Sequence, residues 1–117
     1  MKLIRMKCVP CEGGVEPLKP RKAKEYLHEV DIGWRMLKGK RISRQFRFRD
    51  FVRAMRFVNE VAAIAEREGH HPDMHIERWN HVRVEIYTHA IGGLHENDFI
   101  LAAKIDRLFE KSMKKHK

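Results

Sequence analysis

The chain has 117 residues, is 43% hydrophobic and carries a formal net charge of +9. This length suits one domain, so we expect residues 1–117 to fold together, with residues 1–19 forming an N-terminal arm. No apolar stretch is long enough to predict a membrane span or a signal segment, which favours the cytoplasm. The basic residues are dispersed among acidic ones, so we do not expect nucleic-acid binding.

The first predicted elements are a helix and a hairpin. Pro20 is suited to the first turn of a helix, and apolar residues recur at helical spacing until Gly33 ends the segment. Residues 34–37 and 42–48 then read as two strands joined by a turn at 38–40, because apolar and polar residues alternate in the second of them.

The longest predicted helix covers residues 50–69. Asp50 is a favourable N-cap, and apolar residues follow in steps of three and four. Gly69 suits the C′ position, and Pro72 prevents the helix from continuing. This segment therefore has both its beginning and its end marked in the sequence.

A second hairpin and a last helix complete the chain. Residues 74–79 and 82–88 are predicted strands with a turn at 80–81, and a helix is expected from about Glu96 to about Lys114. Two hairpins, each followed by a helix, predict an α+β fold. We expect a two-layer sandwich in which a four-stranded antiparallel sheet carries three helices on one face.

Histidines are the most informative residues. His70 and His71 lie between the predicted helix end and Pro72, and His89 ends the fourth predicted strand. Histidine titrates near neutral pH, so three histidines in one pocket would suit a proton-transfer reaction. They would converge with Asp98 if the second hairpin folds back beside helix 50–69. The alternatives are structural: histidines that complement the helix dipole and an aspartate that caps the last helix.

Two metal hypotheses are weaker. His70, His71, His75 and His89 could supply imidazoles to zinc, but adjacent residues seldom reach one ion and no HExxH or HxH pattern is present. We therefore expect no metal. Cys8 and Cys11 form a CxxC followed by a glycine-rich loop, which favours an incidental pair over a metal or disulfide clip.

The spacing of these residues resembles the signature of the pterin-4a-carbinolamine dehydratases. The signature runs through Glu66, His70, His71, Pro72, Trp79, His89 and Asp98. Further similar segments are 33–34, 48–51, 57–59, 88–89, 92–94 and 97–99, and the Cys8/Cys11 arm is common in prokaryotic members, so the resemblance covers almost the whole chain. One position departs, because His95 stands where members usually have Thr or Ser, and this would weaken the N-cap of the last helix.

This resemblance implies the same α+β fold, a homodimer or homotetramer, and dehydration of a 4a-hydroxytetrahydropterin to the quinonoid dihydropterin without a metal or redox cofactor. It implies that His70 and His89 form the acid/base pair and that His71 mainly binds the pterin. Four further residues are implied as supporting or substrate-binding: Glu66, Asp98, Trp34 and Trp79. Two alternatives stay open, namely a non-enzymatic dimerisation or interaction module and a dehydratase-like role in molybdopterin metabolism.

Overall fold

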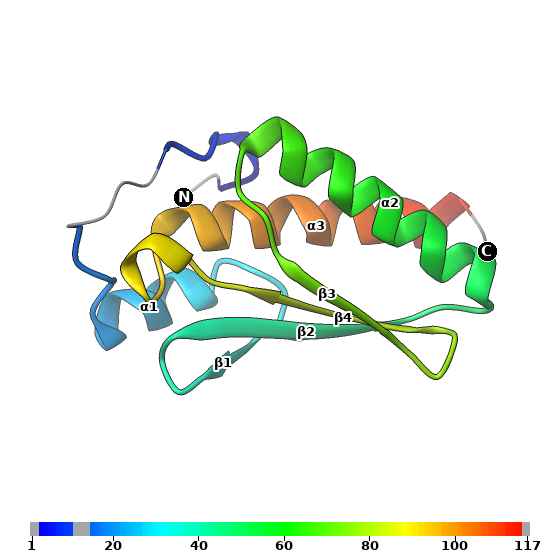
Figure 1. Cartoon of the computed structure of the whole chain (residues 1–117), viewed down its shortest axis with the longest axis horizontal. Coiled ribbons are helices and arrows are strands. Elements are labelled where there is room, and N and C mark those ends of the chain that lie inside the picture. Colours follow the sequence, from blue (N-terminus) through cyan, green and yellow to red (C-terminus); the bar gives the residue numbers. More distant parts are fainter. Residues whose placement is uncertain (1–2, 11–14, 116–117) are drawn as a thin grey trace.

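The computed structural model describes residues 3–10 and 15–115. Figure 1 shows a twisted sheet with long helices laid across it. The elements are α1 Pro20–Leu27, β1 Arg35–Leu37, β2 Arg41–Arg47, α2 Phe51–Glu68, β3 Asp73–Glu77, β4 His81–Ile86 and α3 Glu96–Lys115, with 3-10 turns at Leu3–Arg5 and His89–Ile91.

The four strands form one antiparallel sheet in the order β1-β2-β4-β3. Each hairpin therefore contributes two neighbouring strands, and β2 joins the hairpins by pairing with β4. The three helices pack against this sheet, so the predicted α+β architecture is confirmed. Within the described ranges, no helix has both the length and the apolar character that crossing a membrane requires.

The core lies between the sheet and the helices. Val82, Val84 and Ile86 alternate along β4 and are fully buried, as their spacing predicts. They belong to one core cluster with several aromatic residues, and the Phe46 and Phe57 rings lie 4.8 Å apart between β2 and α2. This packing fixes the position of α2 on the sheet.

Helix α2 begins and ends as predicted. The Asp50 carboxylate accepts a hydrogen bond from the Arg53 backbone N–H at 2.9 Å, which satisfies a donor at the helix start. At the other end Gly69 adopts the left-handed conformation, with φ of 66°. The His70 N–H then donates to the Ala65 carbonyl at 3.2 Å, so the helix end directly sets the position of His70.

The second hairpin differs from its predicted boundaries. Glu77 pairs with His81, so the turn covers residues 78–80 and begins earlier than expected. Arg78 and Trp79 have φ values of 50° and 52°, which are uncommon for residues other than glycine. The sequence offers no glycine there to mark the turn. Trp79 is consequently a turn residue with 65% exposure.

Trp34 is fixed by a buried carboxylate. Its indole Nε1–H donates to Asp106 at 2.7 Å, and the same carboxylate accepts from the Arg44 guanidinium and the Asp31 backbone N–H. Burial raises the pKa of Asp106 above its usual range, against the opposing effect of these donors. The network joins α3 to β2 and to the segment between α1 and β1.

Replacing Trp34 with Phe should lower the free energy of unfolding by about 1–3 kcal/mol, because it removes a donor from a buried carboxylate. Urea denaturation followed by circular dichroism would measure this change. Trp79→Phe is the matched control and should alter stability by less than about 0.5 kcal/mol, since Trp79 is exposed. Equal denaturation midpoints for the two variants would contradict this account of Trp34.

Candidate active site

A pocket of about 260 Å³ lies where α2 ends, β4 ends and the N-terminal arm passes. In Figure 1 these segments meet at the end of the molecule where α3 begins. The lining residues are Val9, Gly69, His70, His71, Tyr87, Thr88, His89 and Ala90. The structure thus brings the three predicted histidines to one pocket.

His70 is held by the buried carboxylate of Asp98. Nε2 of His70 lies 2.6 Å from Oδ1 of Asp98, and the aspartate is fully buried. The other oxygen, Oδ2, accepts hydrogen bonds from the Thr88 hydroxyl at 3.0 Å and the His95 backbone N–H at 2.8 Å. Because a carboxylate only accepts hydrogen bonds, Nε2 of His70 carries the hydrogen and Nδ1 is the nitrogen that can take up a proton.

His71 has a different environment. Its Nε2 lies 2.5 Å from a carboxylate oxygen of Glu66, which is five residues earlier and belongs to the last turn of α2. The His71 side chain is 61% exposed and the Glu66 side chain 77% exposed. An exposed pair is less rigidly held than a buried one, because water competes for both partners. The adjacent histidines are therefore oriented by two different carboxylates.

His89 does not end a strand, which corrects the sequence-based expectation. Strand β4 stops at Ile86, and His89 begins a 3-10 turn that ends at Gly92. Its Nδ1 lies 3.5 Å from the Tyr87 hydroxyl, and its side chain is exposed on the pocket wall. Thr88 is buried between Tyr87 and His89 and contacts Asp98, so one short segment carries both a histidine and a support for the aspartate.

His95 still provides a side-chain cap at the start of α3, although it stands where Thr or Ser was expected. Its Nδ1 accepts a hydrogen bond from the Asn97 N–H at 3.0 Å. Asp98 accepts in return from the His95 N–H, which is the contact that the third helical residue makes in a capping box. Imidazole thus replaces the usual hydroxyl, and Asp98 both caps the helix and holds His70.

The two tryptophans are not brought to this pocket within the chain. Trp34 is buried against Asp106, and Trp79 lies in the turn at the opposite end of β4. His75 lies on β3 and does not line the pocket. In the described part of the chain, no group of three or more His, Cys, Asp or Glu side chains is arranged to hold a metal ion.

Cys8 is a buried structural thiol. Its Sγ lies 3.5 Å from the Asn97 carbonyl oxygen, to which it donates. Burial, reinforced by the neighbouring Glu68 carboxylate, raises the pKa of the Cys8 thiol to about 12, so the thiol is protonated and unreactive at neutral pH. Cys11 lies outside the described residues.

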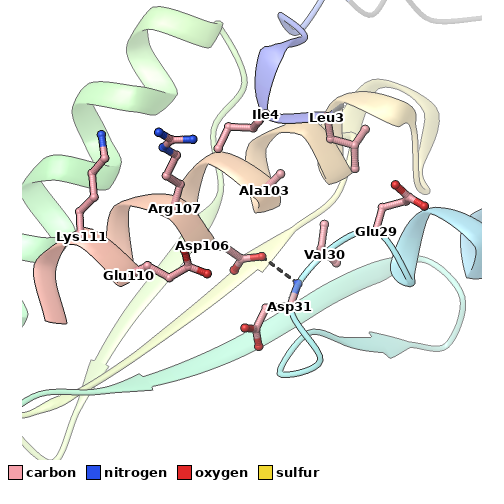
Figure 2. A pocket seen from close by; sticks show the side chains of 10 residues that line it. All are labelled: Leu3, Ile4, Glu29, Val30, Asp31, Ala103, Asp106, Arg107, Glu110 and Lys111. Atoms are coloured by element: carbon pink, nitrogen blue, oxygen red, sulfur yellow. Dashed lines mark hydrogen bonds between the residues drawn. The ribbon is translucent and has the colours of Figure 1, made fainter. Parts of the chain in front are cut away.

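A second cavity, of about 400 Å³, lies beside α3 and the segment that follows α1 (Figure 2). Its lining includes no histidine, and Asp106, one of its carboxylates, accepts a hydrogen bond from the Asp31 backbone. Because none of the predicted site residues reaches this cavity, the histidine pocket is the candidate active site.

Sequence reasoning missed four residues that line the pocket: Val9, Tyr87, Ala90 and Thr88, whose hydroxyl donates to Asp98. Tyr87 and Thr88 directly precede His89 in the sequence, so they could have been predicted as its neighbours in the pocket. Val9 carried no such signal, because it is an isolated apolar residue in an irregular arm.

Comparisons with known proteins support one family. The family described as pterin 4 alpha carbinolamine dehydratase matches residues 16–108. A Nitrosomonas europaea protein, whose name places it provisionally among these dehydratases, is 51% identical over 108 residues, covering 92% of this chain and 94% of its own length. The mitochondrial pterin-4-alpha-carbinolamine dehydratase 2 of Arabidopsis thaliana is 46% identical over 110 residues, covering 91% of this chain and 58% of that protein.

Two solved structures have a similar fold. A transcriptional coactivator/pterin dehydratase from Brucella melitensis superposes with a TM-score of 0.72 at 33% identity, covering 80% of this chain and 98% of that one. A pterin dehydratase-like protein, described as a RuBisCO assembly factor, has a TM-score of 0.55 at 23% identity, covers 65% of this chain and 88% of its own, and shows the fold alone. By family match, sequence identity and fold, this chain belongs to the pterin-4a-carbinolamine dehydratase family.

Proposed function

We propose that this chain is a hydro-lyase that converts a 4a-hydroxytetrahydropterin to the quinonoid dihydropterin and water. The observation that carries the proposal is the convergence of His70, His71 and His89 on one pocket in a chain of this family. Two of the three histidines are paired with carboxylates, and the buried pair of His70 with Asp98 is the more rigid of the two. Such a constellation suits a reaction that moves protons only.

The proposed chemistry needs one acid and one base. Hydroxide is a poor leaving group, so an acid protonates the 4a-oxygen while the carbon–oxygen bond breaks. A base removes the proton of the ring nitrogen as the carbon–nitrogen double bond forms, and water departs. No electrons are exchanged with another molecule, so the step is balanced without a metal or redox cofactor. Positioned histidines contribute about 10²- to 10⁴-fold to such transfers.

The environments of the histidines support a division of roles. His70 and His89 are proposed as the acid/base pair, with His70 held in one tautomer by buried Asp98. His71 is proposed mainly to bind the pterin, because its exposed pairing with Glu66 leaves it freer to adjust to a ligand. Asp98 and Glu66 then act as positioning residues through the histidines that they hold.

His70→Gln and His89→Gln should each lower kcat/KM at least about 10²-fold, because each removes a proton-transfer group. The assay mixes purified protein with chemically generated 4a-hydroxytetrahydropterin and follows the loss of the carbinolamine absorbance. His75→Gln is the control and should match the parent, because His75 is exposed on β3 outside the pocket. Dehydration at the parent rate by both active-site variants would refute the assignment.

The same assay separates the alternative roles. If the protein turned over only a molybdopterin-type pterin, the proposed dehydration chemistry would stand, but the protein would act in molybdopterin metabolism. No turnover of any pterin, together with formation of a complex with a helical peptide, would instead support an interaction module. The cytoplasmic location expected from the sequence remains a prediction.

We also propose that the chain forms a homodimer or homotetramer through α2. Phe51 and Val52 are 50% and 63% exposed on this helix. They border a shallow groove that also includes Met55 and Ala63 and has a volume of about 510 Å³. Exposed apolar side chains that adjoin one another are typical of a contact surface, and a second copy would present the same face in a two-fold arrangement.

Val52→Glu should shift the protein to the monomer, because it places a charge in the proposed contact. Sedimentation velocity at several protein concentrations would measure the shift. Val15→Glu is the control, since Val15 is 49% exposed on the N-terminal arm and lies away from α2 in the sequence. An unchanged sedimentation coefficient for Val52→Glu, in a parent that is oligomeric, would exclude this face as the contact.

A further inference from the structure

The N-terminal arm is anchored where the active-site helices end and begin. We call Lys7–Val9 the strap. The Lys7 ammonium donates to the Arg67 carbonyl at 2.9 Å, in the last turn of α2. The Cys8 N–H donates to the Glu68 carboxylate at 2.9 Å. Figure 1 shows this part of the arm beside the end of α2.

The anchoring carboxylate is itself buried and paired. Lys104 on α3 lies 2.7 Å from Glu68, and the Glu68 side chain is only 8% exposed. Burial alone would raise the pKa of Glu68, but the hydrogen bonds from Lys104 and the Cys8 N–H lower it below its usual range. Glu68 is therefore ionised at neutral pH and connects the strap to both helices.

Asn97 fixes the strap from the side of α3. Its side chain accepts from the Val9 N–H at 3.0 Å and donates to the Val9 carbonyl at 2.6 Å. Asn97 itself is buried, so its side chain is held by the surrounding packing while it pairs with the exposed Val9. Asn97 immediately precedes Asp98, which holds His70. The backbone of Val9 is thus positioned by the same helix turn that orients a proposed catalytic histidine.

The side chain of Val9 needs an explanation that the fold does not give. It lines the histidine pocket yet remains 57% exposed, so it contributes little to the core. The other lining residues are mostly polar, with Ala90 as a second small apolar group. A ligand pocket commonly combines a few polar groups with apolar contact surface for the body of the ligand.

We propose that Val9 is a substrate-contacting residue, which the strap holds as an apolar wall against the pterin. This inference rests on the proposed function and extends it to a residue far from the signature. Val9 binds and does not react, so it contributes equally to the ground state and the transition state. Its loss should change KM more than kcat.

Steady-state kinetics of Val9→Ala test the contact. The substitution removes two carbon atoms from the apolar side chain and so weakens its contact with the pterin. KM should therefore rise about 5- to 15-fold, while kcat stays within about twofold of the parent. Val15→Ala is the matched control, an exposed valine of the same arm outside the pocket, and should leave both constants unchanged. A KM for Val9→Ala equal to that of Val15→Ala would overturn the proposal.

Thiol labelling gives a second readout that does not use turnover. In a Cys11→Ser background Cys8 is the only thiol, and its burial makes alkylation depend on release of the strap. The product-like 7,8-dihydrobiopterin is added at about ten times its dissociation constant. It should slow alkylation of Cys8 about tenfold, because it binds the protein only while the strap is in place. At the same pterin concentration the protection should be smaller with Val9→Ala. The proposal would be overturned if the pterin gave no protection, or if it protected Cys8 equally with and without the Val9→Ala substitution.

Failure of the two proposals can be told apart. A parent that neither turns over a 4a-hydroxytetrahydropterin nor binds 7,8-dihydrobiopterin would overturn the proposed function and this inference with it. A parent that does both, combined with a Val9→Ala variant that behaves as the parent, would overturn the role of Val9 alone.

Discussion

The buried carboxylate of Asp98 is the group on which the site depends. Its two oxygens contact His70, the Thr88 hydroxyl and the His95 backbone N–H, so one side chain joins the segment after α2, the loop after β4 and the start of α3. A fully buried carboxylate must have its hydrogen-bonding capacity met, because leaving it unpaired would cost several kcal/mol. The requirement to satisfy this group therefore fixes three segments in one arrangement.

The same end of the molecule also organises the N-terminal arm. Helix α2 contributes Glu68 and helix α3 contributes Asn97, and both hold the backbone of Cys8 and Val9. The proposed catalytic histidine His70 and the proposed contact residue Val9 are thus held by neighbouring residues of one helix turn, Asp98 and Asn97. Rigid helix ends keep side chains close to a productive geometry better than free loops do. The exposed His71 and Glu66 form the less constrained part of the site.

Much of the fold could be predicted because its signals are local. Asp50 and Gly69 mark the ends of α2, and alternation marks the buried face of β4, as the structure confirms. Prediction failed where local signals were absent or misleading. Arg78 and Trp79 adopt left-handed conformations without glycine, and His89 begins a turn where continued alternation suggested a strand. Both boundaries follow the pairing with neighbouring strands, which sequence periodicity does not report: Glu77 pairs with His81, and the last pair of β4 is Ile86 with Ile42.

The sequence by itself determined the α+β fold, the family and the set of histidines, because spacing along the chain encodes periodicity and signature. Only the tertiary structure decided which carboxylate holds which histidine, that Trp34 belongs to the core, and that Val9 reaches the pocket. These are contacts between residues far apart in the chain. Their partners are selected by the packing of helices on the sheet and by the need to pair buried polar groups, neither of which leaves a local pattern.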